Sequence, residues 1–116
     1  MVYTINTKFE WDDEKAERNP LKHGISFEMA VFAFDDPYAL IMDDERHSAA
    51  EHRQWLIGDS GERVVVIVFT IRPPKGNIRI VSARRANRRE RKKYEESKGI
   101  LFLKSAPGHA AGNAGF

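Results

Sequence analysis

Cysteine is absent from the 116 residues, which excludes disulfide frameworks and thiolate zinc sites. A metal would need histidine or carboxylate ligands, and no spacing typical of such a site occurs, so we expect neither a metal nor another cofactor. No apolar run approaches the length of a membrane span, and the opening MVYTINTKFEW lacks the uninterrupted apolar segment of a signal peptide. We therefore expect a soluble, cytoplasmic protein with no membrane partner.

The sequence also lacks a glycine-rich phosphate loop and a recognisable order of serine, histidine and aspartate. Charge is abundant, and its two signs are separated along the chain. Residues 1–62 hold six basic and fourteen acidic residues, a balance of −8, whereas residues 63–116 hold thirteen basic and three acidic, a balance of +10. This separation favours a basic surface for a polyanion and an acidic surface for another partner, or two halves that attract each other within the fold.

A chain of this length forms one domain with a single core. The last dozen residues are rich in glycine and alanine, show no period and carry almost no charge, which is typical of a flexible tail. We therefore predict one domain over residues 1–98 and a tail over residues 99–116. The apolar patch at 100–103 can dock on the core or on another chain.

Two helices are predicted in the N-terminal part. Asp12 and Asp13 are suited to cap a first helix, which Gly24 ends. Lys22 and His23 then lie at its C-terminus, where they at least complement the helix dipole. A second helix is predicted from residue 26, because apolar residues recur at helical spacing at Phe27, Ala30, Val31 and Phe34. An Asp-Asp-Pro sequence then ends this pattern.

Strands follow these helices. Residues 38–42 form a short apolar strand candidate, and residues 53–58 alternate between two faces. Residues 64–71 are apolar or β-branched without a charge, which predicts a central strand buried on both faces. A loop with two prolines and a glycine then leads to an antiparallel strand over 77–83. The prediction is an α+β domain with a meander of about four antiparallel strands.

Residues 78–94, IRIVSARRANRRERKKY, change from a strand to a basic helix. Asn87 is a suitable N-cap for that helix. Arginines at the end of a strand and the start of a helix have fixed backbones, which suits guanidinium groups that bind a phosphate.

Strand alternation places Arg79 on the face of Val81 and Ala83, opposite Ile78 and Ile80. An arginine on an interior face needs a carboxylate, which Glu90 or an acidic residue of the N-terminal half could supply, so a structural ion pair is the alternative to a phosphate-binding role.

On the C-terminal helix, one stripe faces the body of the protein and comprises Ala86, Glu90, Tyr94 and Ser97. The remaining basic side chains of the helix then point mostly outward. They are suited to contact phosphate groups or an acidic partner.

An ordered set of short motifs resembles the BrnT family, the toxins of bacterial BrnT/BrnA type II toxin–antitoxin modules. The resemblance covers residues 9 to about 97, and the sequence KHG followed by SARRA with a later Glu and Tyr is its most specific part. The residues that carry it are Phe9, Trp11, Asp12, Lys15, Lys22, His23, Gly24, Phe34, Asp35, Asp36, Pro37, Glu51, Arg53, Ile57, Gly58, Glu90 and Tyr94, with RIVSARRA at 79–86.

The resemblance implies a RelE-like fold. In this fold two N-terminal helices pack on one side of a twisted antiparallel sheet of about four strands, a ribonuclease groove lies on the other side, and here a basic C-terminal helix follows. It also implies an enzyme that cleaves RNA, inhibits translation and is neutralised by a BrnA-type antitoxin. The expected partners are therefore RNA and the antitoxin, in a hetero-oligomer that binds operator DNA through the antitoxin.

A metal-independent endoribonuclease fits these residues. The RNA supplies its own nucleophile, the 2′-hydroxyl, so the enzyme must remove that proton, stabilise charge on the phosphate and protonate the leaving 5′-oxygen. We predict phosphate contacts from Arg53, Arg79, Arg84 and Arg85, a base in Glu51 or His23, and an acid in His23, Lys22 or Tyr94. Further RNA contacts are expected from Arg72, Arg88, Arg89 and Lys92.

Two other classes of function remain open from the sequence. One is a non-catalytic regulator whose helix at 87–97 contacts DNA, although this helix offers few Asn or Gln side chains for base edges and follows no helix-turn-helix pair. The other is an interaction domain whose basic helix docks on an acidic partner. Expression of the chain alone in a bacterium discriminates the ribonuclease from both of these classes, because rapid growth arrest favours the ribonuclease and tolerance favours either binding protein.

Overall fold

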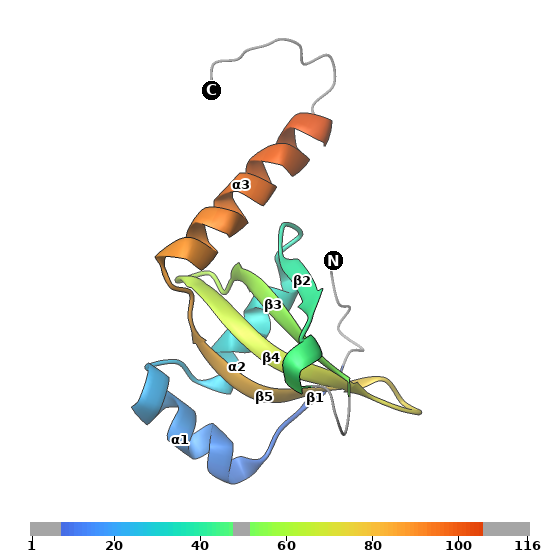
Figure 1. The fold of residues 1–116 in the computed structure, drawn as a ribbon. Coiled ribbons are helices and arrows are strands. Elements are labelled where there is room, and N and C mark those ends of the chain that lie inside the picture. Colours follow the sequence, from blue (N-terminus) through green and yellow to red (C-terminus); the bar gives the residue numbers. More distant parts are fainter. Residues whose placement is uncertain (1–7, 48–51, 106–116) are drawn as a thin grey trace.

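The computed structural model describes residues 8–47 and 52–105 of the chain. Within them the chain forms an α+β fold with a five-stranded mixed sheet of order β1-β5-β4-β3-β2 (Figure 1). None of the described helices is long and apolar enough to span a bilayer. The strands are β1 (Phe9–Glu10), β2 (Leu40–Asp43), β3 (Arg53–Asp59), β4 (Val64–Arg72) and β5 (Asn77–Arg85); the helices are α1 (Asp13–His23), α2 (Phe27–Ala30) and α3 (Arg88–Ser105), with 3-10 turns at η1 (Val31–Asp35) and η2 (Glu45–His47).

The α+β class is confirmed, but the sheet and the second helix differ from the predicted layout. Strands β2 to β5 pair antiparallel, and β1 adds a fifth strand parallel to β5. The second helix is one α-helical turn that tightens into the 3-10 turn η1, and its buried residues are Phe27, Ala30, Ala33 and Phe34. Helix α3 continues to Ser105, into the segment predicted as a tail.

Helix α1 begins and ends where the sequence predicted. The Asp12 carboxylate accepts a hydrogen bond from the Lys15 backbone N–H at 3.1 Å, and Gly24 has a left-handed φ of 73° and donates to the carbonyl of Pro20. This cap and this stop fix which residues occupy the last turn, Lys22 and His23.

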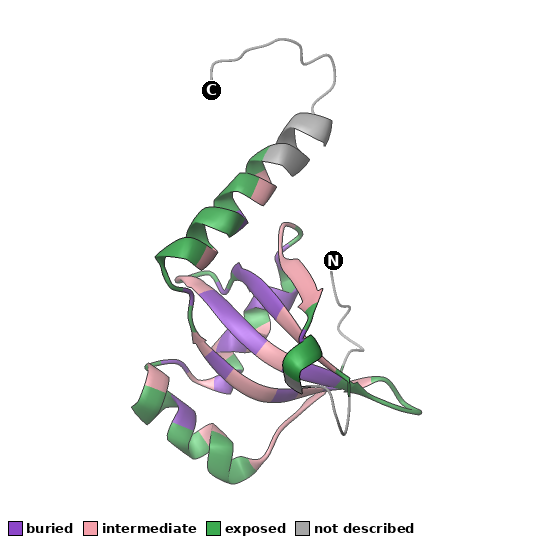
Figure 2. Ribbon diagram, in the orientation of Figure 1, coloured by how far each residue is buried: buried purple, intermediate pink, exposed green. Residues whose placement is uncertain are grey.

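The main core lies between the sheet and the helices α1 and α2, which cover one face (Figures 1 and 2). Phe34 is at its centre and packs against Phe9 and Phe69 at ring distances of 5.1 Å each. We call the opposite face of the sheet the open face. The first half of α3 covers one end of it, because Tyr94 packs there with Ile57.

Candidate functional site

A β-bulge in β5 decides which side chains reach the open face. Val68 of β4 pairs with Ser82 and the next residue, Phe69, pairs with Ile80, so Val81 is an extra residue without a partner on β4. The alternation of β5 therefore reverses after Val81. Ala83 joins Ile78 and Ile80 in the core beneath the helices, and the prediction that Ala83 shares a face with Arg79 is wrong.

Because of the same bulge, Arg84 lies on the same face as Arg53 and Arg79. Arg53 of β3 pairs with Thr70 of β4, which pairs with Arg79 of β5, so these residues form one row across the open face. Arg84 pairs with Val66, which faces the same side. In a regular strand side chains alternate between the two faces, so without the extra residue Arg79 and Arg84, five positions apart, would lie on opposite faces.

Arg79 is held by the carboxylate of Glu10. Its Nη1 donates to Glu10 Oε2 at 2.9 Å, and Asn77 donates to the other oxygen at 3.2 Å. The hydrogen bonds from Asn77 and then Arg79 hold the pKa of Glu10 below its usual value. The N-terminal half thus supplies the ion-pair partner expected for Arg79. A guanidinium has five N–H groups, so Arg79 keeps further donors for a phosphate.

Arg84 is held in a two-pronged pair with Glu90. Its Nη1 and Nη2 donate to the two carboxylate oxygens at 2.8 Å each. Glu90 also accepts from the backbone N–H of Asn87 at 2.9 Å while Asn87 Oδ1 accepts from the Glu90 N–H, which is a capping box and confirms Asn87 as the N-cap. These bonds, that of Arg84 first, lower the pKa of Glu90. One carboxylate therefore joins the end of β5 to the start of α3.

Trp55 supplies an aromatic surface beside these arginines. It lies in the row with Val68 and Ser82, and the Arg84 guanidinium carbon lies 5.8 Å from its ring centroid. Trp55 Nε1 and Thr70 Oγ1 are buried polar atoms, and neither has a hydrogen-bond partner among the described residues. Aromatic rings and guanidinium planes stack with the unpaired bases of single-stranded RNA.

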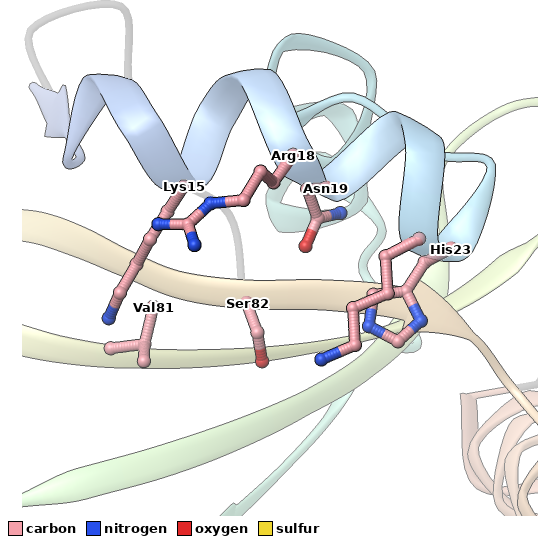
Figure 3. Close-up of a pocket in the computed structure, with 7 residues that line it drawn as sticks. Lys15, Arg18, Asn19, His23, Val81 and Ser82 are labelled. Atoms are coloured by element: carbon pink, nitrogen blue, oxygen red, sulfur yellow. The ribbon is translucent and has the colours of Figure 1, made fainter.

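A second group of cations lines a pocket between α1 and the free edge of β5. Its volume is about 260 Å³. Figure 3 shows Lys15, Arg18 and His23 reaching from α1 toward Val81 and Ser82 of β5. Asn19 and Lys22 complete the lining, and no carboxylate is among the described residues that form it. Lys22 and His23, which are predicted site residues and neighbours in the sequence, both line this pocket, and Ser82 is common to the pocket and the open face.

Tyr94 lies apart from this chemistry. It is buried, and its hydroxyl donates to Asp36 Oδ2 at 2.5 Å. Burial, followed by the bond to Asp36, raises the pKa of Tyr94. This position does not fit the predicted role of proton donor to RNA, because the proton is held by a buried carboxylate.

The remaining predicted residues are distributed around these two groups. Arg85 follows the bulge onto the helix-covered side, where its guanidinium packs beside Gly24. Arg72 ends β4 and is exposed, as are the α3 residues Arg88, Arg89 and Lys92. Glu51 lies outside the described residues. Among the residues described, no three histidine, aspartate or glutamate side chains gather as a metal site requires.

Comparison with protein families supports the resemblance found in the sequence. The family described as "Ribonuclease toxin, BrnT, of type II toxin-antitoxin system" matches residues 11–90. The chain belongs to the BrnT family. The match runs from before α1 into the first turn of α3 and so includes the α1 pocket and the arginines of the open face.

A curated protein also matches a short part of the chain. The 32 kDa beta-galactoside-binding lectin of Caenorhabditis elegans is 39% identical over 44 residues, which are 38% of this chain and 16% of the lectin. The chain thus corresponds to a small part of that relative's length. Galactoside binding is a property of the lectin.

Several residues of the site were not predicted from the sequence as catalytic or RNA-binding residues, although Lys15 is among those that carry the family resemblance. They are Lys15, Arg18, Trp55 and Ser82. Trp55 follows Arg53 by two positions in a strand, and Lys15 precedes Lys22 by two helical turns, so strand and helix periodicity could have found both. Ser82 could not be found in this way, because its face depends on the bulge.

Proposed function

We propose that this chain is an endoribonuclease that cleaves single-stranded RNA on the open face. The observation that supports the proposal is that Arg53, Arg79 and Arg84 share one face of the sheet, whose strand β5 also borders the cationic pocket that contains His23. Membership of the BrnT family supports the same activity.

The chemistry follows from the groups that are present. The 2′-hydroxyl of the RNA attacks its own phosphorus, the P–O5′ bond breaks, and a 2′,3′-cyclic phosphate and a 5′-hydroxyl form. Arg79 and Arg84 stabilise the charge that develops on the phosphate oxygens. We assign the proton exchange with the 2′- and 5′-oxygens to His23, which lines the α1 pocket together with Lys22. No metal is required by this scheme.

The ion pairs orient the arginines before RNA binds. Glu10 fixes Arg79 and Glu90 fixes Arg84, so little conformational entropy is lost when a phosphate arrives. Glu90 occupies both terminal nitrogens of Arg84, so a phosphate must share that guanidinium with the carboxylate or contact it through Nε. Arg79, bonded to Glu10 through one nitrogen, is the more available phosphate ligand.

Cleavage of a fluorescent single-stranded RNA by the purified chain in excess EDTA tests the proposal. Arg79→Ala and Arg84→Ala should each lower the cleavage rate by about two to three decades, as expected for the loss of one well-placed charge contact. Lys75→Ala removes one positive charge from the exposed β4–β5 turn and should retain activity. Circular dichroism shows whether each variant is folded. RNA binding without cleavage by the wild-type chain would favour a non-catalytic RNA-binding protein instead.

The finer consequences of family membership belong to the same proposal. We infer that the chain has the RelE-like arrangement, acts in the bacterial cytoplasm, inhibits translation and is neutralised by a BrnA-type antitoxin that carries the complex to operator DNA. Induction of the wild-type chain should arrest growth, whereas Arg79→Ala and Arg84→Ala should not. Both variants should still bind the antitoxin. Growth arrest by a folded Arg79→Ala protein would contradict the assignment of this residue.

A further inference from the structure

The scheme above leaves two cations of the α1 pocket without a role. Lys15 and Arg18 lie one helical turn apart on the pocket side of α1, and both line the cavity together with His23 (Figure 3). Arg18 uses its Nε to donate to the carbonyl of Glu14 at 3.4 Å, which leaves the end of its guanidinium toward the pocket. Two cations on one wall, with no carboxylate among the described lining residues, attract an anion.

Ser82 connects the lining of the α1 pocket with the face of the sheet that carries the arginines. Ser82, which lines the pocket, lies on β5 between Arg79 and Arg84 and faces the same side. At the other end of the pocket, backbone hydrogen bonds from Lys15 and Glu14 lower the pKa of Asp12, and the positive charges of Lys15 and Arg79 lower it further. A strand of RNA that contacts Arg79 can therefore extend along the edge of β5 into the pocket.

Asn19 fixes the distance between the α1 pocket and the arginines of the open face. This buried side chain donates to the carbonyls of Ala83 at 2.7 Å and Ile25 at 2.8 Å, and its oxygen accepts from the Ala83 N–H at 3.4 Å. Asn19 thus bonds the backbone N–H and carbonyl groups that a neighbouring strand would bond at this edge of β5, beyond the two β5 residues that pair with β1. These bonds hold α1 at a fixed position against β5. A binding site for a polymer with regularly spaced phosphates requires such a fixed position.

We propose that the α1 pocket binds a backbone phosphate of the RNA next to the scissile one, with Lys15, Arg18 and the Ser82 hydroxyl as its ligands. This inference rests on the proposed ribonuclease function. The ligand is a phosphate rather than a base because no phenylalanine, tyrosine or tryptophan is among the described residues that line the pocket, and its side walls are cationic. The pocket would therefore contribute to affinity and to the position of the substrate, without preference for a base.

The direct test measures binding of a non-cleavable RNA. A single-stranded 2′-O-methyl oligonucleotide is titrated into the full chain at several salt concentrations, with Lys15→Ala/Arg18→Ala as the variant. We expect roughly tenfold weaker binding at low salt and a salt dependence of log K that is smaller by about 0.7, which is the value for one lost phosphate contact on a single strand. Lys8→Ala/Lys75→Ala, which removes the same charge from exposed positions outside the pocket, should keep the wild-type salt dependence.

Neutral linkages in the RNA locate the contact. When one phosphate at a time is replaced by a methylphosphonate, the wild-type chain should lose affinity at the position next to the scissile linkage, whereas the double variant should lose little there. The loss of affinity caused by the neutral linkage and the loss caused by the double variant are then not additive, as in a double-mutant cycle for two groups in contact. Equal losses in both proteins at every position would overturn the inference and leave the ribonuclease proposal intact. Failure of the wild-type chain to bind or cleave any RNA would overturn both.

Discussion

Removal of the Tyr94 hydroxyl separates a structural role of this residue from a catalytic one. The ring packs against Ile57 and Val66 beneath α3, and the hydroxyl donates to Asp36, which is only 9% exposed. Asp36 also accepts the backbone N–H groups of Tyr38 at 2.9 Å and Asp59 at 2.8 Å. Tyr94→Phe keeps the ring and deletes one of the three donors that the described part of the chain supplies to this buried carboxylate.

The expected cost follows from that geometry. A hydrogen bond to a charged, buried group contributes about 1.5–3 kcal/mol, so we expect Tyr94→Phe to lower the free energy of unfolding by about 2 kcal/mol. For a domain of this size that corresponds to a fall in Tm of about 10 °C. Tyr38→Phe is the matched control, since it removes a hydroxyl from a half-buried ring of the same cluster and should change stability by less than about 0.5 kcal/mol.

Thermal unfolding by circular dichroism and RNA cleavage well below Tm provide the two measurements. If Tyr94 holds α3 on the sheet, the folded Tyr94→Phe protein should cleave RNA within about threefold of the wild-type rate. If Tyr94 instead donates the proton to the leaving oxygen, the variant should lose two decades or more of rate. An unchanged Tm together with lost cleavage would refute the structural assignment.

Two further predictions concern the groups that hold the site together. Glu90→Gln keeps the capping box but loses the charge that pairs with Arg84, and should lower the free energy of unfolding by about 1 kcal/mol at neutral pH. Because the folded-state pKa of Glu90 is lowered, this contribution is present above the unfolded-state pKa and is lost as the pH falls through the folded-state pKa. The stabilities of wild type and variant, measured by urea unfolding, should therefore converge in acid, and an undiminished difference there would contradict the prediction. Asn19→Ala leaves the carbonyls of Ala83 and Ile25 without their buried donor and should cost about 2–3 kcal/mol in urea unfolding, whereas a cost below about 0.5 kcal/mol would show that water replaces the amide.

Local signals in the sequence located most of the secondary structure. The Asp12 cap, the Gly24 stop and the Asn87 cap are chemical events within a few residues, so they could be predicted and the structure confirms them. The parallel pairing of β1 with β5 could not be predicted, because two residues carry no periodic signal. The shortening of the second helix was also missed, since spacings of three and of 3.6 differ little over two turns.

The sequence by itself determined the α+β class, the separated charge and the resemblance to the BrnT family, and it selected the arginines at the end of β5. Only the tertiary structure decided that Arg79 and Arg84 share a face, because one extra residue in β5 reverses its alternation and shows only in its pairing with β4. The carboxylate that holds Arg79 and the cations opposite Ser82 also come from segments distant in sequence, so the fold alone brings them to one site.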